Sequence, residues 1–289
     1  MSLYAVNDLQ VTIGGKPVVS DVSFTVGRGE CIALVGASGS GKSQTCLAPF
    51  GLSPGVAQGS ATFDGTELVG VTPDELRRIR GRAIGFVFQQ PLTALTPHLT
   101  IGAQLAEAWQ RGGQPKPEQD AMVVALERVG IENPDESLDQ FPHRLSGGQR
   151  QRALIAMAIA HRPRLLIADE PTSALDAELR AEIMALLDRL RREEDMALLL
   201  VSHDLAAVGD HADRIVMLRD GQVEETGPAQ SLLATPASDY GRALVAATPR
   251  LSDPPPTLPK TGDTLLEARE ISVSFPRPGF RKGRVDAVR

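Results

Sequence analysis

The stretch Gly36-Ala37-Ser38-Gly39-Ser40-Gly41-Lys42-Ser43 follows an apolar run, Cys31–Val35, that is typical of a buried parallel strand. Its glycines let successive backbone N–H groups turn inward around phosphate oxygens, and the helix expected after it adds a favourable dipole. The pattern predicts a phosphate-binding loop, the P-loop, whose residues 36–43 all contact a nucleotide; the alternative is a glycine-rich turn without a ligand. We expect Lys42 to reach the β- and γ-phosphates and Ser43 to ligate Mg²⁺.

A second apolar run, residues 165–168, ends in two acids, Asp169 and Glu170. An acid at the end of a buried strand is costly unless it meets a cation. We therefore expect Asp169 to hold Mg²⁺ through water and Glu170 to polarise the attacking water. The alternative, that the two acids only cap the next helix, is less favoured beside a P-loop.

The third motif is Leu145-Ser146-Gly147-Gly148-Gln149, which precedes an apolar helix pattern. Its N–H groups would lie at a helix N-terminus, where they could bind phosphate. Alone, such a pentapeptide would be an ordinary N-cap loop. Between a P-loop and an acidic strand it resembles the signature motif of the ATP-binding-cassette (ABC) ATPases, and this resemblance covers roughly residues 3–250.

The resemblance implies roles for further residues in binding and hydrolysing ATP with Mg²⁺. Gln89 resembles the glutamine that contacts Mg²⁺ and water and links the ATP site to a membrane partner. His203, after a third apolar run at 196–201, resembles the histidine that contacts the γ-phosphate. Ser173 and Asp176 resemble the D-loop, which crosses an interface between two cassettes. The implied catalytic set is Lys42, Gln89, Glu170 and His203, and the implied metal set is Ser43, Gln89 and Asp169.

The resemblance implies a head-to-tail pair of cassettes. The physics is consistent with such a pair, since one P-loop covers only part of the γ-phosphate charge. Residues 146–149 (Ser146, Gly147, Gly148 and Gln149) would then act on the nucleotide of the opposite cassette. One position departs from the family pattern, since Ile13 stands where an aromatic residue usually stacks on adenine. Aliphatic contact is weaker than stacking, and Tyr4 lies too far upstream to substitute.

The order of the predicted elements indicates an α/β fold. With the resemblance, it predicts a P-loop NTPase cassette with a RecA-like parallel-sheet core, an N-terminal antiparallel β subdomain and a helical insertion at about residues 90–160. Asp220-Gly221 predicts a type I′ hairpin turn after a strand at 215–218. Thr72-Pro73-Asp74-Glu75 predicts a helix start with a capping box. Helices are also expected at residues 117–130 and 176–193.

The composition changes near residue 249. Residues 249–264 hold five prolines and are typical of an extended linker between an ABC domain at 1–248 and a remainder at 265–289. Leu265 through Phe275 align with Leu3 through Ile13, so that the apolar positions coincide. We interpret the remainder as the start of a second, truncated ABC domain in a fused two-cassette protein. The alternative is a C-terminal strand that returns to the first domain.

Composition also narrows the function classes. The 289 residues carry 30 Lys+Arg against 36 Asp+Glu, a net charge of −6, and 4% aromatics, which argues against a nucleic-acid partner. No apolar run approaches the roughly 20 residues of a membrane span, and the N-terminus lacks the form of a signal peptide. The two cysteines, Cys31 and Cys46, exclude a disulfide framework. Together these features predict a cytoplasmic protein.

Three stretches resemble the ATPases of oligopeptide, dipeptide and nickel importers, namely residues 88–97, 141–152 and 240–251. The resemblance implies the energy-coupling subunit of a peptide-type importer, peripheral on the cytoplasmic face of the inner membrane. Its implied partners are a second cassette, membrane permeases and, indirectly, a solute-binding protein. The alternatives are a nickel or other non-peptide cargo, and a soluble ABC ATPase of translation or DNA repair without a permease. An exporter is disfavoured because exporter cassettes are usually fused to transmembrane helices.

Overall fold

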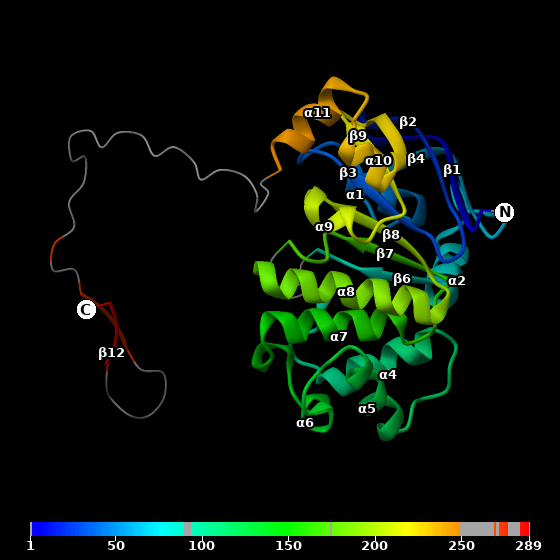
Figure 1. Cartoon of the computed structure of the whole chain (residues 1–289). Helices are drawn as coiled ribbons and strands as arrows, with labels where there is room; N and C mark the ends of the chain where they lie inside the picture. The colour runs from blue at the N-terminus through cyan, green and yellow to red at the C-terminus, as the bar shows by residue number, and fades with distance from the viewer. Residues whose placement is uncertain are drawn as a thin grey trace. The chain divides into compact units, whose positions relative to one another are not determined.

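The computed structural model describes residues 2–89, 94–173, 175–248, 269, 272–276 and 284–288. The chain divides into two compact units, Met1–Pro249 and Arg250–Arg289. The first unit holds two sheets with helices around them (Figure 1). In the second unit, the described residues form a hairpin of β11 (Val273–Pro276) and β12 (Arg284–Val288). The expected linker, residues 249–264, lies wholly outside the described residues.

The first sheet is antiparallel, with the strand order β2-β1-β4-β5. Its strands are β1 (Tyr4–Ile13), β2 (Lys16–Val26), β4 (Val56–Phe63) and β5 (Thr66–Glu67). Alternation along β2 turns Val22, Phe24 and Val26 inward, as the sequence predicts. The expected N-terminal antiparallel β subdomain is confirmed.

The second sheet has six strands in the order β10-β9-β3-β8-β7-β6. Parallel pairing joins β3 (Cys31–Val35), β6 (Ile84–Val87), β7 (Leu165–Asp169), β8 (Ala197–Ser202) and β9 (Arg214–Arg219). The edge strand β10 (Gln222–Pro228) pairs antiparallel with β9 through Asp220 and Gly221, whose φ angles are 50° and 79°. Positive φ at both central positions is what a type I′ turn requires. Because the other five strands are parallel, the residues that follow β3, β6, β7 and β8 meet at one edge of the sheet.

The parallel sheet is buried on both faces. Along β3, Cys31, Ala33 and Val35 belong to the apolar cluster shared with the helices, whereas Ile32 and Leu34 belong to the cluster shared with the antiparallel sheet. This double burial explains why β3 shows a continuous apolar run in the sequence rather than alternation. The predicted RecA-like parallel-sheet core is confirmed.

Helices surround the sheets and form the predicted insertion, in which α4 to α7 gather on one side of α8 (Figure 1). The helices of the described residues include α1 (Lys42–Leu47), α2 (Pro73–Ala83), α4 (Ile101–Arg111), α5 (Gln119–Arg128), α6 (Pro134–Leu138), α7 (Gly147–Ile159), α8 (Ala177–Glu194), α9 (Leu205–Gly209), α10 (Ala229–Ala234) and α11 (Asp239–Ala246), with 3₁₀ turns at Ala48–Phe50 and Pro142–Arg144. The capping box predicted at Thr72 is present at the start of α2.

Several predicted boundaries shift by one or two residues. The helix expected at 117–130 begins only at Gln119, because Glu118 keeps the extended backbone of an N-cap. The helix expected from residue 176 begins at Ala177, since Asp176 is its N-cap. The strand expected at 165–168 continues to Asp169, and the strand expected at 196–201 is Ala197–Ser202.

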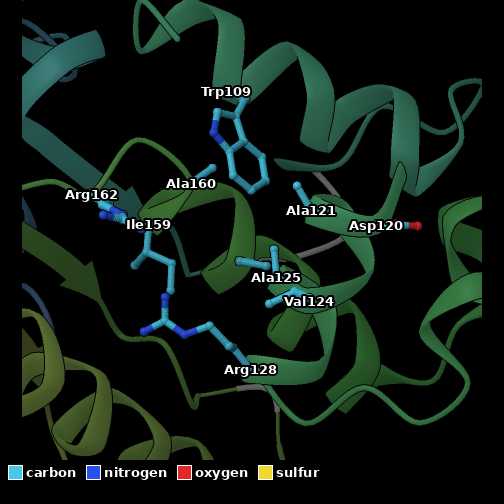
Figure 2. Close-up of a pocket in the computed structure, with 10 residues that line it drawn as sticks. Trp109, Asp120, Ala121, Val124, Ala125, Arg128, Ile159, Ala160 and Arg162 are labelled. Carbon is cyan, nitrogen blue, oxygen red and sulfur yellow. The ribbon is translucent and has the colours of Figure 1, made fainter. Parts of the chain in front are cut away.

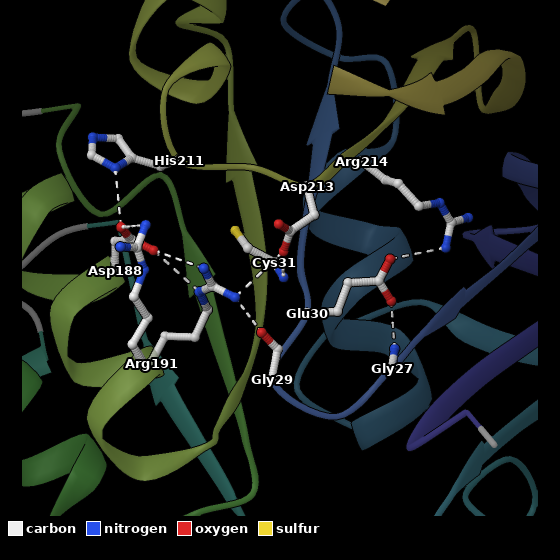
Figure 3. A network of polar contacts seen from close by, with 10 residues as sticks. Gly27, Gly29, Glu30, Cys31, Asp188, Arg191, His211, Asp213 and Arg214 are labelled. Carbon is white, nitrogen blue, oxygen red and sulfur yellow. Dashed lines mark hydrogen bonds and ion pairs between the residues drawn. The ribbon is translucent and has the colours of Figure 1, made fainter. Parts of the chain in front are cut away.

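A buried arginine holds the amino end of β3 (Figure 3). Arg191, on α8, donates to the carbonyl oxygen of Gly29 and pairs with Asp188 at 2.9 Å and Asp213 at 3.4 Å. Asp213 also accepts the N–H of Cys31 at 2.7 Å. Burial raises the pKa of Cys31 to about 12, so this thiol stays protonated and serves packing. The network thus secures the edge of the sheet opposite the one where the strands' carboxyl ends meet.

Candidate functional site

The P-loop leaves β3 at Gly36 and enters α1 at Lys42. Glycine is needed at position 36 because a Cβ there would lie 2.2 Å from the carbonyl oxygen of Leu218 on β9. Lys42 is buried, and its Nζ donates to the carbonyl oxygens of Gly36 and Ala37, each at 2.9 Å. Burial lowers the pKa of Lys42, while two nearby carboxylates at the end of β7 act in the opposite direction. The ammonium group of Lys42 is therefore held by carbonyl oxygens of the P-loop itself.

The rest of the P-loop offers both exposed and buried groups. Ala37, Ser38 and Gly39 are exposed, whereas Ser40 is buried with its hydroxyl 3.4 Å from Lys42 Nζ. Gly41 has a φ of 93°, and a Cβ there would lie 2.9 Å from the carbonyl oxygen of Val18 on β2. Both sheets thus shape the loop, and this shape leaves its tip open to a ligand.

Two of the three predicted metal ligands lie together. The hydroxyl of Ser43, on the first turn of α1, donates to Asp169 Oδ1 at 2.9 Å. Asp169 is buried, and burial raises its pKa, with a further rise from Glu170; the Ser43 hydrogen bond and Lys42 oppose that rise. The carboxylate and the hydroxyl are both oxygen ligands, the type that Mg²⁺ prefers.

Three predicted catalytic residues follow neighbouring strands and meet. Gln89 follows β6, Glu170 follows β7 and His203 follows β8. Gln89 Nε2 donates to Glu170 Oε2 at 2.8 Å, and His203 Nδ1 lies 3.2 Å from Glu170 Oε1. Glu170 has a φ of 46°, a left-handed conformation that is uncommon for a residue with a side chain and that clusters at functional sites. Gln89, the third predicted metal ligand, therefore contacts Glu170 rather than Ser43 or Asp169.

The signature residues form the start of α7. Ser146 is the N-cap, its Oγ accepts the N–H of Gln149 at 3.2 Å, and Gln149 Oε1 accepts the N–H of Ser146 at 2.9 Å. A Cβ at Gly148 would lie 2.6 Å from a methyl carbon of Leu179, so α7 and α8 approach closely there. Gly147 lies between Ser146 and Gly148, in the first turn of α7. In the described part of the chain, no hydrogen bond joins residues 146–149 to the P-loop.

The two predicted D-loop residues make different contacts. Ser173 Oγ donates to the carbonyl oxygen of Glu170 at 3.2 Å, so it supports the site's central carboxylate residue. Asp176 caps α8, because its Oδ1 accepts the N–H of Leu179 at 3.0 Å. Residue 174 lies outside the described residues.

The predicted adenine position and its rejected substitute lie at opposite ends of β1. Ile13 is half-buried and pairs with Lys16 in the tight connection to β2. Tyr4 is fully buried, with its ring centroid 6.0 Å from that of Phe24 and 5.5 Å from that of Phe50. Tyr4 is a core residue and is not available to a nucleotide.

Sequence reasoning missed two contacts with the site. Tyr240 on α11 accepts the N–H of Ala37 in the P-loop at 2.9 Å. Arg180 on α8 pairs with Asp204, directly after His203, at 2.6 Å. Residues 240–251 resemble one subfamily of ABC ATPases. That resemblance does not indicate that Tyr240 forms a hydrogen bond with the P-loop.

A separate hollow of about 370 Å³ lies in the helical insertion (Figure 2). Trp109 of α4, Val124 of α5 and Ile159 of α7 line it, together with Arg128 and Arg162. It contains none of the predicted site residues and is distinct from the nucleotide site. None of the helices in the described part of the chain combines the length and the hydropathy needed to cross a bilayer.

Comparison with known proteins identifies the family of this chain. The ABC transporter family profile matches residues 19–173. The dipeptide transport ATP-binding protein DppD of Haemophilus influenzae is 42% identical over 88% of this chain and 79% of its own length. An uncharacterized ABC transporter ATP-binding protein, YejF of Escherichia coli K12, is 40% identical over 94% of this chain but only 52% of its own length.

A solved structure has the same architecture. The ATP-binding cassette MJ0796, solved as a dimer in a post-hydrolysis state with ADP and Pi, superposes with a TM-score of 0.70 at 29% identity, over 78% of this chain and 99% of that one. The fold and site define an ATP-binding cassette. The chain belongs to the ABC transporter family and is an ATPase of that family, as the motifs predict.

Proposed function

We propose that this chain is the ATP-hydrolysing, energy-coupling subunit of an importer for peptides or related small solutes. The observation that carries the hydrolytic part is the position of Glu170, held between Gln89 at 2.8 Å and His203 at 3.2 Å where three parallel strands end. The peptide-type cargo is supported by the DppD relative, whose name assigns it to dipeptide transport.

In this proposal Glu170 is the general base that polarises the attacking water. The amide of Gln89 orients the carboxylate from one side, and the His203 imidazole lies on the other, where it would meet the γ-phosphate. When ATP binds, the Lys42 ammonium would exchange its hydrogen bonds to the carbonyl oxygens of Gly36 and Ala37 for contacts with the β- and γ-phosphates. The remaining P-loop N–H groups hold phosphate oxygens, and Ile13 supplies aliphatic contact to adenine.

The donor set at Ser43 and Asp169 fits Mg²⁺. One hydroxyl and one buried carboxylate are oxygen donors 2.9 Å apart, and the described residues contain no cluster of three or more His, Cys, Asp or Glu that would form a complete cage. Such a partial set suits Mg²⁺, which keeps several waters and binds substrate phosphates. When bound, the ion would neutralise charge on the β- and γ-phosphates. Gln89 would complete the metal set from across the site.

The partners in this proposal are a second cassette and membrane permeases. The signature residues at the start of α7, of which Ser146 and Gly147 are exposed, would complete the opposite cassette's ATP site, head to tail, with Ser173 and Asp176 at the interface between the two. The dimeric MJ0796 structure supports that arrangement. Permease docking would place the chain on the cytoplasmic face of the membrane, with a solute-binding protein delivering cargo on the other side.

We also propose that residues 265–289 begin a second cassette. The hairpin of β11 and β12 repeats three residue pairs from the end of the β1–β2 pairing, including a register shift that follows Val11 in β1 and Val273 in β11. In β1–β2 the pairs are Val11 with Val19, Thr12 with Pro17 and Ile13 with Lys16; in β11–β12 they are Val273 with Val288, Ser274 with Asp286 and Phe275 with Val285. This chain matches 52% of the length of the YejF relative, which leaves room in that protein for a second domain of similar size.

The substitution Glu170→Gln tests the hydrolytic role. We expect ATP binding to persist while turnover falls by about 10²- to 10⁴-fold, and an ATP-bound dimer to accumulate on size-exclusion chromatography. Glu127→Gln, at an exposed position of α5, is the matched control and keeps the parental rate. Hydrolysis by Glu170→Gln at the parental rate would contradict the assignment.

Co-purification tests the partners. A chain co-expressed with peptide-importer permeases is expected to be recovered with the permeases in detergent extracts. Recovery with ribosomes or with DNA-repair proteins would instead favour the soluble alternative. Binding of nickel, rather than peptide, by the co-encoded solute-binding protein would change the cargo without changing the role of this chain.

A further inference from the structure

The hydroxyl of Tyr240 bridges the P-loop and β9, and none of the roles assigned above uses it. Ala37 N–H donates to Tyr240 Oη at 2.9 Å, and Tyr240 Oη donates to the carbonyl oxygen of Leu218 at 3.4 Å. A phenol has one proton to give and lone pairs to accept with, so both bonds form together. A phenylalanine could make neither.

The helix that carries Tyr240 is anchored beside the site. Glu225, on β10, accepts the N–H of Ala237 at 2.8 Å and both the N–H and the hydroxyl of Ser238, at 3.1 and 2.9 Å. A Cβ at Gly241 would lie 2.8 Å from Glu225 Oε2, so the helix and strand approach closely at that point. These contacts fix the start of α11 where Tyr240 sits.

The ring of Tyr240 is held as well as its hydroxyl. The guanidinium carbon of Arg219 lies 5.3 Å from the ring centroid, within cation–π range. Arg219 ends β9, one residue beyond the Leu218 carbonyl that the hydroxyl contacts. The same hairpin reaches the far end of the P-loop, because Gly221 N–H donates to the carbonyl oxygen of Ser40 at 3.2 Å.

We propose that Tyr240 is a positioning residue for the P-loop, an inference that rests on the proposed ATP site. Its hydroxyl orients the Ala37 peptide before nucleotide arrives, so less of the loop has to be ordered on binding. The bond also couples α11 to nucleotide affinity, because α11 and the P-loop share this contact. The protein therefore uses a segment distant in sequence to set how tightly it holds ATP.

Paired tyrosine-to-phenylalanine substitutions test this role. The chain has two tyrosines, and the hydroxyl of the other, Tyr4, is buried without a hydrogen-bond partner among the described residues. Tyr240→Phe is expected to raise the dissociation constant for ATP by roughly two- to tenfold, the net effect of one hydrogen bond. KM should rise by a similar factor and kcat should stay within about twofold. Tyr4→Phe removes the same atom and should leave both constants unchanged.

A spectroscopic readout separates positioning from stability. In chain labelled with ¹³C at the tyrosine Cζ, two signals are expected, and Tyr4→Phe assigns them. Saturating ATP should shift the Tyr240 signal and leave the Tyr4 signal in place. Glu225→Gln, which weakens the anchor of α11, should reproduce part of the affinity loss.

The outcomes distinguish the two proposals. If the parental chain binds ATP and Tyr240→Phe binds it equally well, the positioning role is wrong and the proposed function stands. A fall in kcat at constant KM would also overturn it, because the hydroxyl would then act in the chemical step. If the parental chain itself fails to bind ATP, the proposed function fails and the inference fails with it.

Discussion

The hydroxyl of Ser43, at the start of α1, donates a 2.9 Å hydrogen bond to the carboxylate of Asp169, at the end of β7. The contact joins the P-loop helix to the acidic strand across a sheet whose strand order places β8 between β3 and β7. It leaves one carboxylate oxygen free of Ser43. This arrangement suits the proposed Mg²⁺ site, in which Ser43 would ligate the ion and Asp169 would hold it through water.

Asp169→Asn is expected to remove the Mg²⁺ dependence of ATP binding. The amide oxygen still accepts the Ser43 hydroxyl, so the local geometry survives, but the negative charge that attracts the ion is lost. Titrating ATP with Mg²⁺ and with EDTA measures the effect. The parental protein should bind ATP more tightly with Mg²⁺ than with EDTA, whereas the variant should bind ATP with similar affinity in the two conditions. An unchanged effect of Mg²⁺ in the variant would contradict the metal role.

The raised pKa of Asp169 predicts a pH dependence of stability without ligand. Burial makes the folded protein hold this proton more tightly than the unfolded chain, where an aspartate titrates near about 3.9. The free energy of unfolding should therefore fall as the pH rises from that value through the raised pKa. Urea unfolding of the parental protein and of Asp169→Asn across this range measures the slope. The free energy of unfolding should fall more steeply with pH in the parental protein than in Asp169→Asn. Equal slopes in the two proteins would contradict the prediction.

Gly221 is expected to tolerate no side chain, and the chain contains a matched control. Gly221 and Gly65 each follow an aspartate in a tight turn, and both have a φ of 79°. A Cβ at Gly221 would lie 2.5 Å from the carbonyl oxygen of Val18, whereas nothing lies within 4 Å of a Cβ at Gly65.

Gly65→Ala should therefore cost about 1–2 kcal/mol from the backbone conformation alone. Gly221→Ala should cost about 1–3 kcal/mol more because of overpacking. It should also weaken ATP binding, since Gly221 contacts Ser40 in the P-loop. Chemical unfolding and ATP titration of both variants measure these effects, and equal losses of stability would argue against the close approach.

Ser146 is expected to serve both as a helix cap and as a ligand of the opposite nucleotide. Thr72 forms the same type of capping box on α2, away from the signature motif. Ser146→Ala and Thr72→Ala should each lower the free energy of unfolding by about 1 kcal/mol. Only Ser146→Ala should also weaken ATP-dependent dimerisation, measured by light scattering; equal dimerisation of the two variants would leave Ser146 with a capping role alone.

Much of the fold was predictable because the decisive signals are local. The apolar run at Cys31–Val35 and the glycines after it specify a strand, a loop and a helix within a short segment, and the Asp220-Gly221 pair specifies its own turn. Helix ends were less predictable, because Glu118 and Asp176 stand outside the helices that they precede.

By itself, the sequence determined the family, the order of the motifs along the chain and the residues that follow each strand. Each of these can be recognised from a short run of consecutive residues. Only the tertiary structure decided that Glu170 lies between Gln89 and His203, that Gln89 is not beside Ser43, and that Tyr240 reaches Ala37. Those contacts join segments far apart in the chain. Their distances follow from how strands and helices pack around a shared core, which no local pattern of residues specifies.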